Sequence, residues 1–374
     1  MTNYNDKKLI ISLSFRLITL LLISFLGLSL LEIALRIDEE SKLCIWPPNQ
    51  KYYYTPSDSI MPGIRDTSFI NFNSFGFRTL SEDTTSGLNI VLLGGSTTEC
   101  LFLDQSETWG AIMGEQLESI YGMKVNIFNG GKSGLNSQDH LLQIEELLSV
   151  NNWIDIIIIM VGINDLGYAL TQWPLFSRLS PEILRVRSFY TEVPDESIPF
   201  YKRSLVYKKI GRLFYSVGKY HRAYHDPEGL FYINKRQERE SGVIIDERPN
   251  MSKSLEDYRK NISNIINICK TKGVKLVFVD QATIYSNQIS EYNESLCWGG
   301  QMGESDHKGI GKFLSIIRLG ELMQEYNSLL ESECLRNNIP MIEISSKLEK
   351  DTTTFYDDCH FNESGARKVS DLLV

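Results

Sequence analysis

Histidine is scarce in this sequence and its cysteines follow no regular spacing, which argues against the commonest protein metal sites. Only five histidines occur in 374 residues, and no H-E-x-x-H motif is among them, so a catalytic zinc site is not indicated. The six cysteines include no C-x-x-C pair, so a structural zinc site is not indicated either.

Positive charge is also in short supply. The formal net charge of −9 gives no reason to expect nucleic acid as a partner. No internal repeat is evident, which argues against a solenoid. What is present is a globular composition, with 42% hydrophobic and 23% charged residues. A chain of this length can form one large domain or two ordinary ones.

One long apolar run lies near the amino terminus, at Leu9–Leu31. At about 1.5 Å per residue it spans roughly 34 Å as a helix, enough to cross a hydrocarbon core of about 30 Å. Lys7 and Lys8 favour a cytoplasmic amino end. We therefore expect a cytoplasmic tail at 1–8, a single-span anchor at 9–37, and the rest of the chain outside the cytoplasm. A cleaved signal peptide and a buried soluble helix are the competing interpretations.

Beyond residue 88, short runs of branched apolar residues alternate with helical patterns. Strands are expected at Asn89–Leu93, Lys124–Phe128, Ile154–Val161, Val274–Asp280 and Pro340–Ile344. Helices are expected near Glu107–Tyr121, Ser137–Ser149, Leu255–Lys272, Ile310–Asn337 and from Asn362 onward. This alternation predicts an α/β fold with a parallel sheet covered by helices on both faces.

Two regions depart from that alternation. Residues 38–87 are rich in proline and tyrosine and are expected to form an irregular stalk and strap on the main domain. Within them, Phe69–Thr79 alternates aromatic and polar residues, which predicts a short strand or hairpin sealing a domain edge. Residues 170–251 interrupt the main domain, 88–374. They are a lid, a membrane-surface helix around Ser204–Tyr215, or a solvated insertion with a small core of its own, and charge pattern alone does not decide.

The whole chain is organised around the stretch from Asn89 to Glu99, which reads Asn-Ile-Val-Leu-Leu-Gly-Gly-Ser-Thr-Thr-Glu. A buried strand, a glycine turn and Ser96 at a helix start place one hydroxyl at the carboxyl edge of the sheet. Open α/β sheets bind ligands at that edge. Taken alone, the same pattern also fits an ordinary turn in which Ser96 is a helix N-cap.

Three further clusters follow the carboxyl ends of predicted strands, at 129–134, 162–165 and 357–362. Acyl transfer needs a nucleophile, a base and a carboxylate that holds the base, and Ser96, His360 and Asp357 can supply them. It also needs donors aimed at the developing oxyanion. The backbone N–H groups of Ser96 and Gly134 and the side-chain amide of Asn164 can supply these.

The set resembles the SGNH/GDSL hydrolase superfamily, with the four clusters in the family's order. Gly94-Gly-Ser-Thr-Thr is similar to the first block, Asn129-x-x-x-x-Gly134 to the second, Gly162-x-Asn164-Asp165 to the third and Asp357-x-x-His360 to the fifth. The resemblance implies that Ser96 is the nucleophile, His360 the base and Asp357 its partner, with Gly134 and Asn164 in the oxyanion hole. It also implies a flavodoxin-like three-layer α/β/α fold with about five parallel strands, and no metal or organic cofactor.

The sequence departs from the family at Gly95, where many members carry Asp before the serine. The Gly-Gly-Ser-Thr variant is similar to a membrane-anchored bacterial subgroup, which also tends to have an Asn-Ser-x-Gly-Phe-Arg stretch, here Asn73 to Arg78. Losing the Asp removes no triad member, but it leaves the local support of the serine turn open.

Residues 358 and 359 leave two questions. Spacing alone allows Asp358 to compete with Asp357 as the partner of His360. Cys359 is interpreted as structural, because a catalytic cysteine needs its own positioned base. A disulfide between Cys359 and Cys297 is expected if the compartment is oxidising.

These observations predict a membrane-anchored serine esterase of the SGNH type that deacylates or deacetylates surface carbohydrate. One alternative is an O-acyltransferase that uses the same triad to pass an acyl group to a sugar hydroxyl. A second is a non-catalytic glycan-binding or assembly protein on the same fold, and a third is a lipase-like enzyme whose insertion contacts lipid. The intact set of Ser96, Gly134, Asn164, Asp357 and His360 argues against a binding protein.

Overall fold

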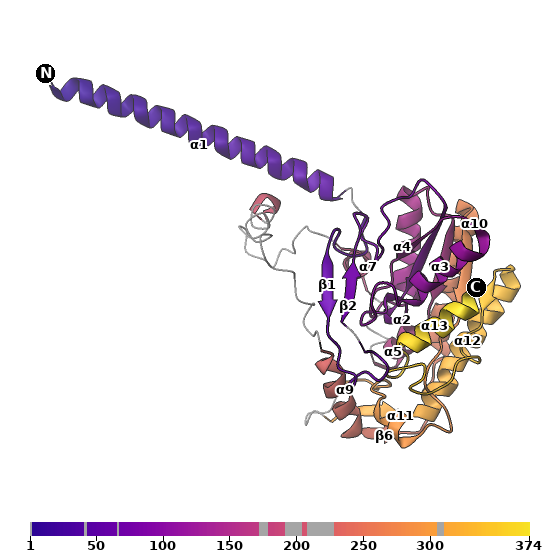
Figure 1. Ribbon diagram of the computed structural model, residues 1–374. Helices are drawn as coiled ribbons and strands as arrows, with labels where there is room; N and C mark the ends of the chain where they lie inside the picture. Colours follow the sequence, from indigo (N-terminus) through magenta and orange to yellow (C-terminus); the bar gives the residue numbers. More distant parts are fainter. Residues whose placement is uncertain are drawn as a thin grey trace. The chain divides into compact units, whose positions relative to one another are not determined.

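The computed structural model describes residues 2–40, 43–65, 67–171, 179–190, 204–207, 228–304 and 310–374 (Figure 1). Contacts between residues divide the chain into two compact units. One comprises Met1–Leu43 with Thr191–Lys219, and the other comprises Cys44–Tyr190 with Tyr220–Val374.

The first unit contains α1 (Thr2–Glu40), a single long helix. Its stretch Ser14–Ile37 has a mean hydropathy of 2.3 and is exposed, so by length and composition it can cross a membrane, as a signal sequence also can. The carboxylate of Glu32 accepts hydrogen bonds from Ser204 Oγ at 2.9 Å and from the next two backbone N–H groups at 3.1 and 3.0 Å. The helix expected at Ser204–Tyr215 is seen only over 205–207, and the rest of that range lies outside the described residues.

The second unit is built on a five-stranded parallel sheet whose strands agree with the predicted ones to within two residues at each end. They are β3 (Leu88–Gly94), β4 (Val125–Asn129), β5 (Ile156–Met160), β7 (Lys275–Val279) and β9 (Met341–Ile342). The order across the sheet is β4-β3-β5-β7-β9, with every neighbouring pair parallel. This is the flavodoxin-like order, in which the second strand lies outside the first. The central strands β3 and β5 are buried nearly throughout because their side chains are apolar on both faces.

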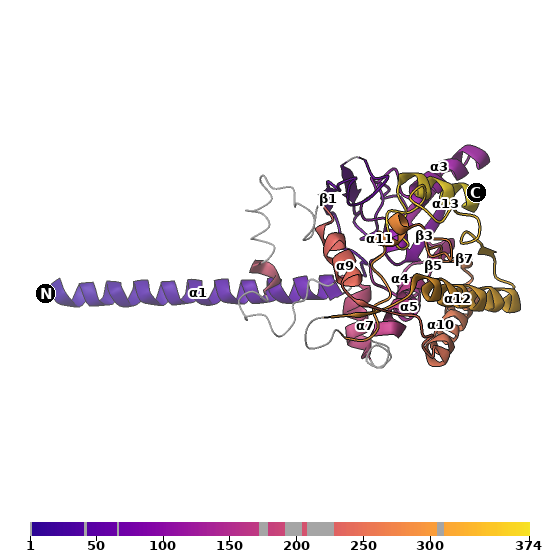
Figure 2. The ribbon, with the colours of Figure 1, turned by 90° about the horizontal axis from the view of Figure 1, so that it is seen from below.

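Five main helices cover this sheet. They are α3 (Trp109–Tyr121), α4 (Ser137–Val150), α10 (Ser252–Lys272), α12 (Ile316–Asn337) and α13 (Glu363–Leu373). Right-handed crossovers place α3 on one face and α4, α10 and α12 on the other. The contacts agree, because α3 packs against α13 while α10 packs against both α4 and α12 (Figure 2). The predicted three-layer α/β/α fold is therefore confirmed.

One helix boundary was predicted wrongly. The helix expected from Ile310 begins at Ile316, with Ser315 as its N-cap. The residues before it form β8 (Lys312–Leu314), which pairs in parallel with β6 (Val243–Ile245). The apolar residues of this short strand fit the helical periodicity by chance, and the distant pairing decided the outcome.

The strap is more regular than the sequence suggested. Lys51–Tyr54 forms β1, which pairs antiparallel with β2 (Ser68–Asn71); the turn residues around the tyrosines obscured this strand. Downstream, Arg78 makes a bridge to Asn129, donating its N–H to the carbonyl at 2.8 Å. Because Asn129 is the last residue of the edge strand β4, the stretch Phe69–Thr79 reaches this edge of the sheet at that one position.

Candidate active site

The nucleophile candidate is presented by a sharp turn at the end of β3. Gly95 is the N-cap of the short helix α2 (Ser96–Glu99), so Ser96 is the first helical residue rather than the cap. A Cβ atom at Gly95 would lie 2.3 Å from Asn164 Nδ2. A side chain at this position would therefore displace the amide of Asn164 from where it lies in this structure.

The loop before α13 brings the other two predicted residues to the serine. His360 Nε2 lies 2.7 Å from Ser96 Oγ. On the opposite side of the ring, His360 Nδ1 lies 2.7 Å and 2.8 Å from the two carboxylate oxygens of Asp357. The Asp357 carboxylate is completely buried and also accepts the backbone N–H groups of Cys359 at 3.0 Å and His360 at 2.9 Å. Residues more than 260 positions apart thus form a continuous Ser–His–Asp chain.

The competing carboxylate, Asp358, points elsewhere. It accepts a hydrogen bond from Tyr285 Oη at 2.9 Å and from the backbone N–H groups of Trp298 at 2.7 Å and Gly299 at 3.1 Å. Burial and the negative charge of Asp357 raise the pKa of Asp358. Of the two neighbours, only Asp357 contacts the histidine ring.

The pKa shifts of Asp357 and His360 are those expected of a base that is held by a carboxylate. Burial disfavours both charged forms, but the attraction between the two groups outweighs it. The pKa of Asp357 is lowered, and the pKa of His360 is raised well above its ordinary value. Asp357 therefore stabilises the imidazolium that forms when His360 takes a proton.

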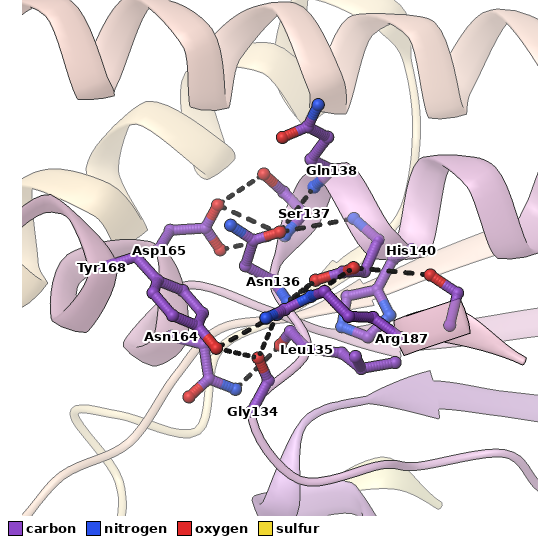
Figure 3. A network of polar contacts seen from close by, with 12 residues as sticks. Gly134, Leu135, Asn136, Ser137, Gln138, His140, Asn164, Asp165, Tyr168 and Arg187 are labelled. Atoms are coloured by element: carbon purple, nitrogen blue, oxygen red, sulfur yellow. Dashed lines mark hydrogen bonds and ion pairs between the residues drawn. The ribbon is translucent and has the colours of Figure 1, made fainter. Parts of the chain in front are cut away.

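Two of the three predicted oxyanion-hole residues, Gly134 and Asn164, lie on adjoining segments. Gly134 adopts a φ of +77°, which favours glycine. Asn164, in α5 (Ile163–Thr171), donates one amide N–H to the carbonyl of Leu135 at 2.7 Å. Since an amide carries two N–H donors, the second one is left for another acceptor. Figure 3 shows Asn164 beside this loop.

Ser96, Asn164 and His360 share the wall of a cavity of about 240 Å³. Much of the remaining wall is aliphatic or aromatic and comes from Ile163, Leu166, Tyr168, Leu170, Tyr285, Trp298 and Leu319. Polar groups also line it, from Thr171, Lys235, Gln301 and Asp358. A larger groove of about 560 Å³ runs beside α12, but neither Ser96 nor His360 lines it. The smaller cavity is where an ester carbonyl can reach the serine.

Sequence reasoning missed the aromatic residues around the histidine. Trp298 Nε1 donates to Asp357 Oδ2 at 3.0 Å, and its ring lies nearly parallel to the His360 ring, 6.5 Å away. Tyr356 stacks on the same ring with centroids 5.4 Å apart, and Tyr232 meets it edge-on at 6.0 Å. No local signal marks these residues, because they come from three separate parts of the chain.

Tyr232 belongs to α9 (Leu230–Glu240), which lies within the insertion. Two arginines of this helix fasten it to the site loops. Arg236 donates to the carbonyls of Leu296 at 3.0 Å and Tyr356 at 3.1 Å, and Arg239 donates to that of Gly299 at 2.8 Å. Lys235 of the same helix lines the cavity that contains Ser96 and His360, so this part of the insertion forms part of that cavity's wall.

Asp357, Cys359 and His360 have ligand-type atoms close enough to hold a metal ion. Two of these groups, however, are already paired through His360 Nδ1, and burial raises the pKa of the Cys359 thiol and keeps it neutral. The donor set fits a proton-transfer pair better than a metal site.

The expected Cys297–Cys359 disulfide is wrong, since both thiols are free. Cys297 Sγ instead lies 3.5 Å from the carbonyl of Asn293.

Several solved structures resemble this chain at low sequence identity. An α/β-hydrolase enzyme from the metagenome of Lake Arreo, Spain, is 11% identical, with 77% of this chain and 94% of that chain covered and a TM-score of 0.41. An acetylxylan esterase from Geobacillus stearothermophilus is 13% identical, with 77% and 93% covered and a TM-score of 0.42. A member of the lipolytic G-D-S-L family from Veillonella parvula is 14% identical, with 76% and 95% covered and a TM-score of 0.38.

No curated protein matches the chain significantly. The family assignment depends instead on a sequence profile described as GDSL-like Lipase/Acylhydrolase, which matches residues 90–373. That range includes all four blocks and both candidate oxyanion segments. The chain belongs to the GDSL-like lipase/acylhydrolase family and is an ester-hydrolysing serine hydrolase.

Proposed function

We propose that this protein is a membrane-anchored esterase that removes short acyl groups, such as acetyl, from carbohydrate outside the cytoplasm. The observation that carries the proposal is the chain of contacts from Ser96 Oγ through His360 to Asp357, with both links at 2.7 Å. Ser96 lines a cavity large enough for a small acylated group.

The reaction follows from this geometry. Ser96 Oγ attacks the ester carbonyl carbon while His360 Nε2 takes the hydroxyl proton. The tetrahedral intermediate collapses, His360 returns the proton to the departing alcohol, and an acyl group stays on Ser96. Water then attacks the acyl-enzyme with His360 again as the base, and the free acid leaves.

Negative charge develops on the carbonyl oxygen in both steps. The backbone N–H groups of Ser96 and Gly134 and the second amide N–H of Asn164 are the proposed donors to that oxygen. Donors held rigidly by the fold stabilise it without reorganisation at the moment of reaction.

Anchoring and substrate follow from less direct arguments. The exposed apolar stretch of α1 supports an anchor, and the lysines before it favour a cytoplasmic amino end. The cavity of about 240 Å³ lies below the range of about 300–1,000 Å³ for sites that hold drug-sized ligands, which favours short acyl groups. A hydrolase held at the membrane would meet esters of the surrounding envelope.

The test is hydrolysis of a chromogenic acetate by the full chain in detergent, beside Ser96→Ala and His360→Ala. We expect both variants to lose activity by at least about 10⁴-fold, because each removes a member of a unit that works only as a whole. Ser149→Ala, at an exposed serine of α4, is the matched control and should retain full activity.

Three outcomes would change the proposal. Full activity of Ser96→Ala would overturn the triad. A folded but inert wild type that acetylates an added sugar hydroxyl would identify an acyltransferase that uses the same residues. Preference for long over short acyl esters would favour a lipase-like enzyme.

A further inference from the structure

The segment that follows Gly134 is held in place by hydrogen bonds at successive residues (Figure 3). The carbonyl of Gly134 accepts Tyr168 Oη at 2.9 Å, and that of Leu135 accepts Asn164. The N–H of Ser137 donates to Asp165 at 3.2 Å. Three of these partners come from α5, so the segment 131–137, called the oxyanion loop here, and the helix carrying Asn164 form one connected body.

One partner of this loop comes from outside the family's blocks. Arg187 lies on α7 (Pro181–Ser188), in the insertion. Its Nη2 donates to the carbonyl of Gly134 at 3.1 Å and lies 3.0 Å from Tyr168 Oη. The same nitrogen is 3.1 Å from the carboxylate of Asp139, which is completely buried. The guanidinium therefore joins the loop, α5 and α4 at a single point.

Asp139 explains why a cation is needed here. It is the N3 residue of α4, where its carboxylate accepts the N–H of Asn136 in a capping box. A buried carboxylate without a positive partner is costly. Arg187 meets that charge through Nε, 3.3 Å from one carboxylate oxygen, and through Nη2, which also reaches the Gly134 carbonyl.

The opposite side of the loop is held from the strap. Trp46 Nε1 donates to the carbonyl of Gly131 at 2.9 Å. Trp46 and Arg187 lie close to a bridge between Cys44 and Tyr190, in which the Tyr190 N–H donates at 2.8 Å. Cys44 and Tyr190 are the residues at which the chain enters and leaves this unit. The oxyanion loop is thus held by Trp46 and Arg187, each close in sequence to Cys44 or Tyr190.

We propose that Arg187 is a positioning residue for the oxyanion hole: by holding the Gly134 carbonyl it restricts the backbone on the carboxyl side of Gly134, and so keeps the neighbouring peptide unit that carries the Gly134 N–H in place beside Asn164. This rests on the proposed function for its effect on rate. The effect on the loop itself can be measured without any substrate.

The experiment compares Arg187→Ala with Arg185→Ala in the full chain. Arg185 lies two residues away on the same helix, is half-exposed and pairs with Glu146 at the surface, so it is a matched control. The first readout is hydrogen exchange of the peptide covering residues 130–137. We expect faster exchange there in Arg187→Ala than in wild type, and no change in Arg185→Ala.

The second readout is kinetic. We expect Arg187→Ala to lower kcat for an acetate ester by about 10–100-fold with KM changed less than about threefold, because the interaction it supports matters in the transition state. Affinity for a boronic acid that forms a tetrahedral adduct with Ser96 should fall by a similar factor. Arg187→Lys, which keeps the charge and one donor, should recover part of the loss.

Unchanged exchange in the 130–137 peptide, or a kcat no lower than that of Arg185→Ala, would overturn the inference. If Arg187→Ala does not fold, the double variant Asp139→Asn/Arg187→Met replaces it, since it removes the guanidinium without leaving the buried Asp139 charge unpaired. An unaltered loop and rate in that variant would be equally fatal. An inert wild type whose loop still loosens in Arg187→Ala would refute the proposed function while leaving the positioning role intact.

Discussion

The sheet edge and the connecting segments contribute to the same site in different ways. At the edge, Ser96, Gly134 and Asn164 follow strands of the parallel sheet in short, readable clusters. The connecting segments contribute Arg187, Tyr232 and Trp298, which no local pattern marks. The first group is constrained by the chemistry of acyl transfer and the second only by where the chain folds back. The type of reaction can therefore be predicted from the residues at the sheet edge. The residues that hold the site in place can be identified only from the tertiary structure.

After the loss of Ser96 or His360, the largest effect should come from the carboxylate that holds the base. Asp357→Asn should lower kcat by about 10²–10⁴-fold, since the imidazolium loses its stabilising charge. His360 must be neutral to accept a proton, so activity rises with pH through its pKa. Asp357 holds that pKa above the ordinary 6.5, so in Asp357→Asn the rise should move to lower pH. The measurement is kcat/KM between about pH 5 and pH 10.

Asp358→Asn provides the contrast within the same loop. Its carboxylate contacts Tyr285 and the Trp298–Gly299 backbone rather than the histidine. The position of the acid limb should stay as in wild type. A shift in this variant equal to that of Asp357→Asn would show that the two carboxylates share the role.

The next effect tests the departure from the family at the serine turn. Gly95→Asp installs the residue that many relatives carry, yet here its Cβ would lie 2.3 Å from Asn164 Nδ2. We expect Asn164 to be displaced and kcat to fall by about 10–100-fold. Gly95→Ala, which adds only the Cβ, should give a smaller loss. Wild-type turnover in Gly95→Asp would mean that Asn164 contributes nothing at this position.

A smaller effect is expected at Trp298, on the connecting side of the comparison. Trp298→Phe keeps an aromatic ring beside His360 but removes the donor to Asp357. The loss of one hydrogen bond to a charged group is worth about 1.5–3 kcal/mol at most, and other donors to the carboxylate remain, so kcat should fall about three- to tenfold. Trp153→Phe, which breaks a bond to Asn151 remote from the cavity, is the control. Equal losses in both variants would argue for a general packing effect.

The smallest expected effect is none. Because the six cysteines are thiols that are not joined in disulfides, a reducing agent should leave the melting temperature and the activity unchanged. Titration of the denatured, unreduced chain should find six reactive thiols. A count of four would restore the disulfide that the structure excludes.

The sequence alone was sufficient for the sheet and for the nature of the chemistry. Buried strands such as Ile156–Met160 can be predicted from the sequence because parallel strands covered on both faces are apolar throughout. The serine, histidine and aspartate were recognisable because acyl transfer admits few residue types and the family keeps them in order. Their grouping could be anticipated, since the carboxyl ends of parallel strands meet at one edge.

Tertiary structure decided what spacing leaves open. Spacing alone left Asp357 and Asp358 open, although the family pattern favoured Asp357, and the contacts of Asp358 with Tyr285 and Trp298 direct this second carboxylate away from the histidine. The helix expected from Ile310 lost its first turn to β8, because pairing with a distant strand outweighs local periodicity. Arg187 reaches Gly134 because α7 folds back on the main domain, where Tyr190, just after this helix, pairs with Cys44 at the start of the strap. Such long-range contacts depend on where segments meet in space, and no local pattern of residues encodes that meeting.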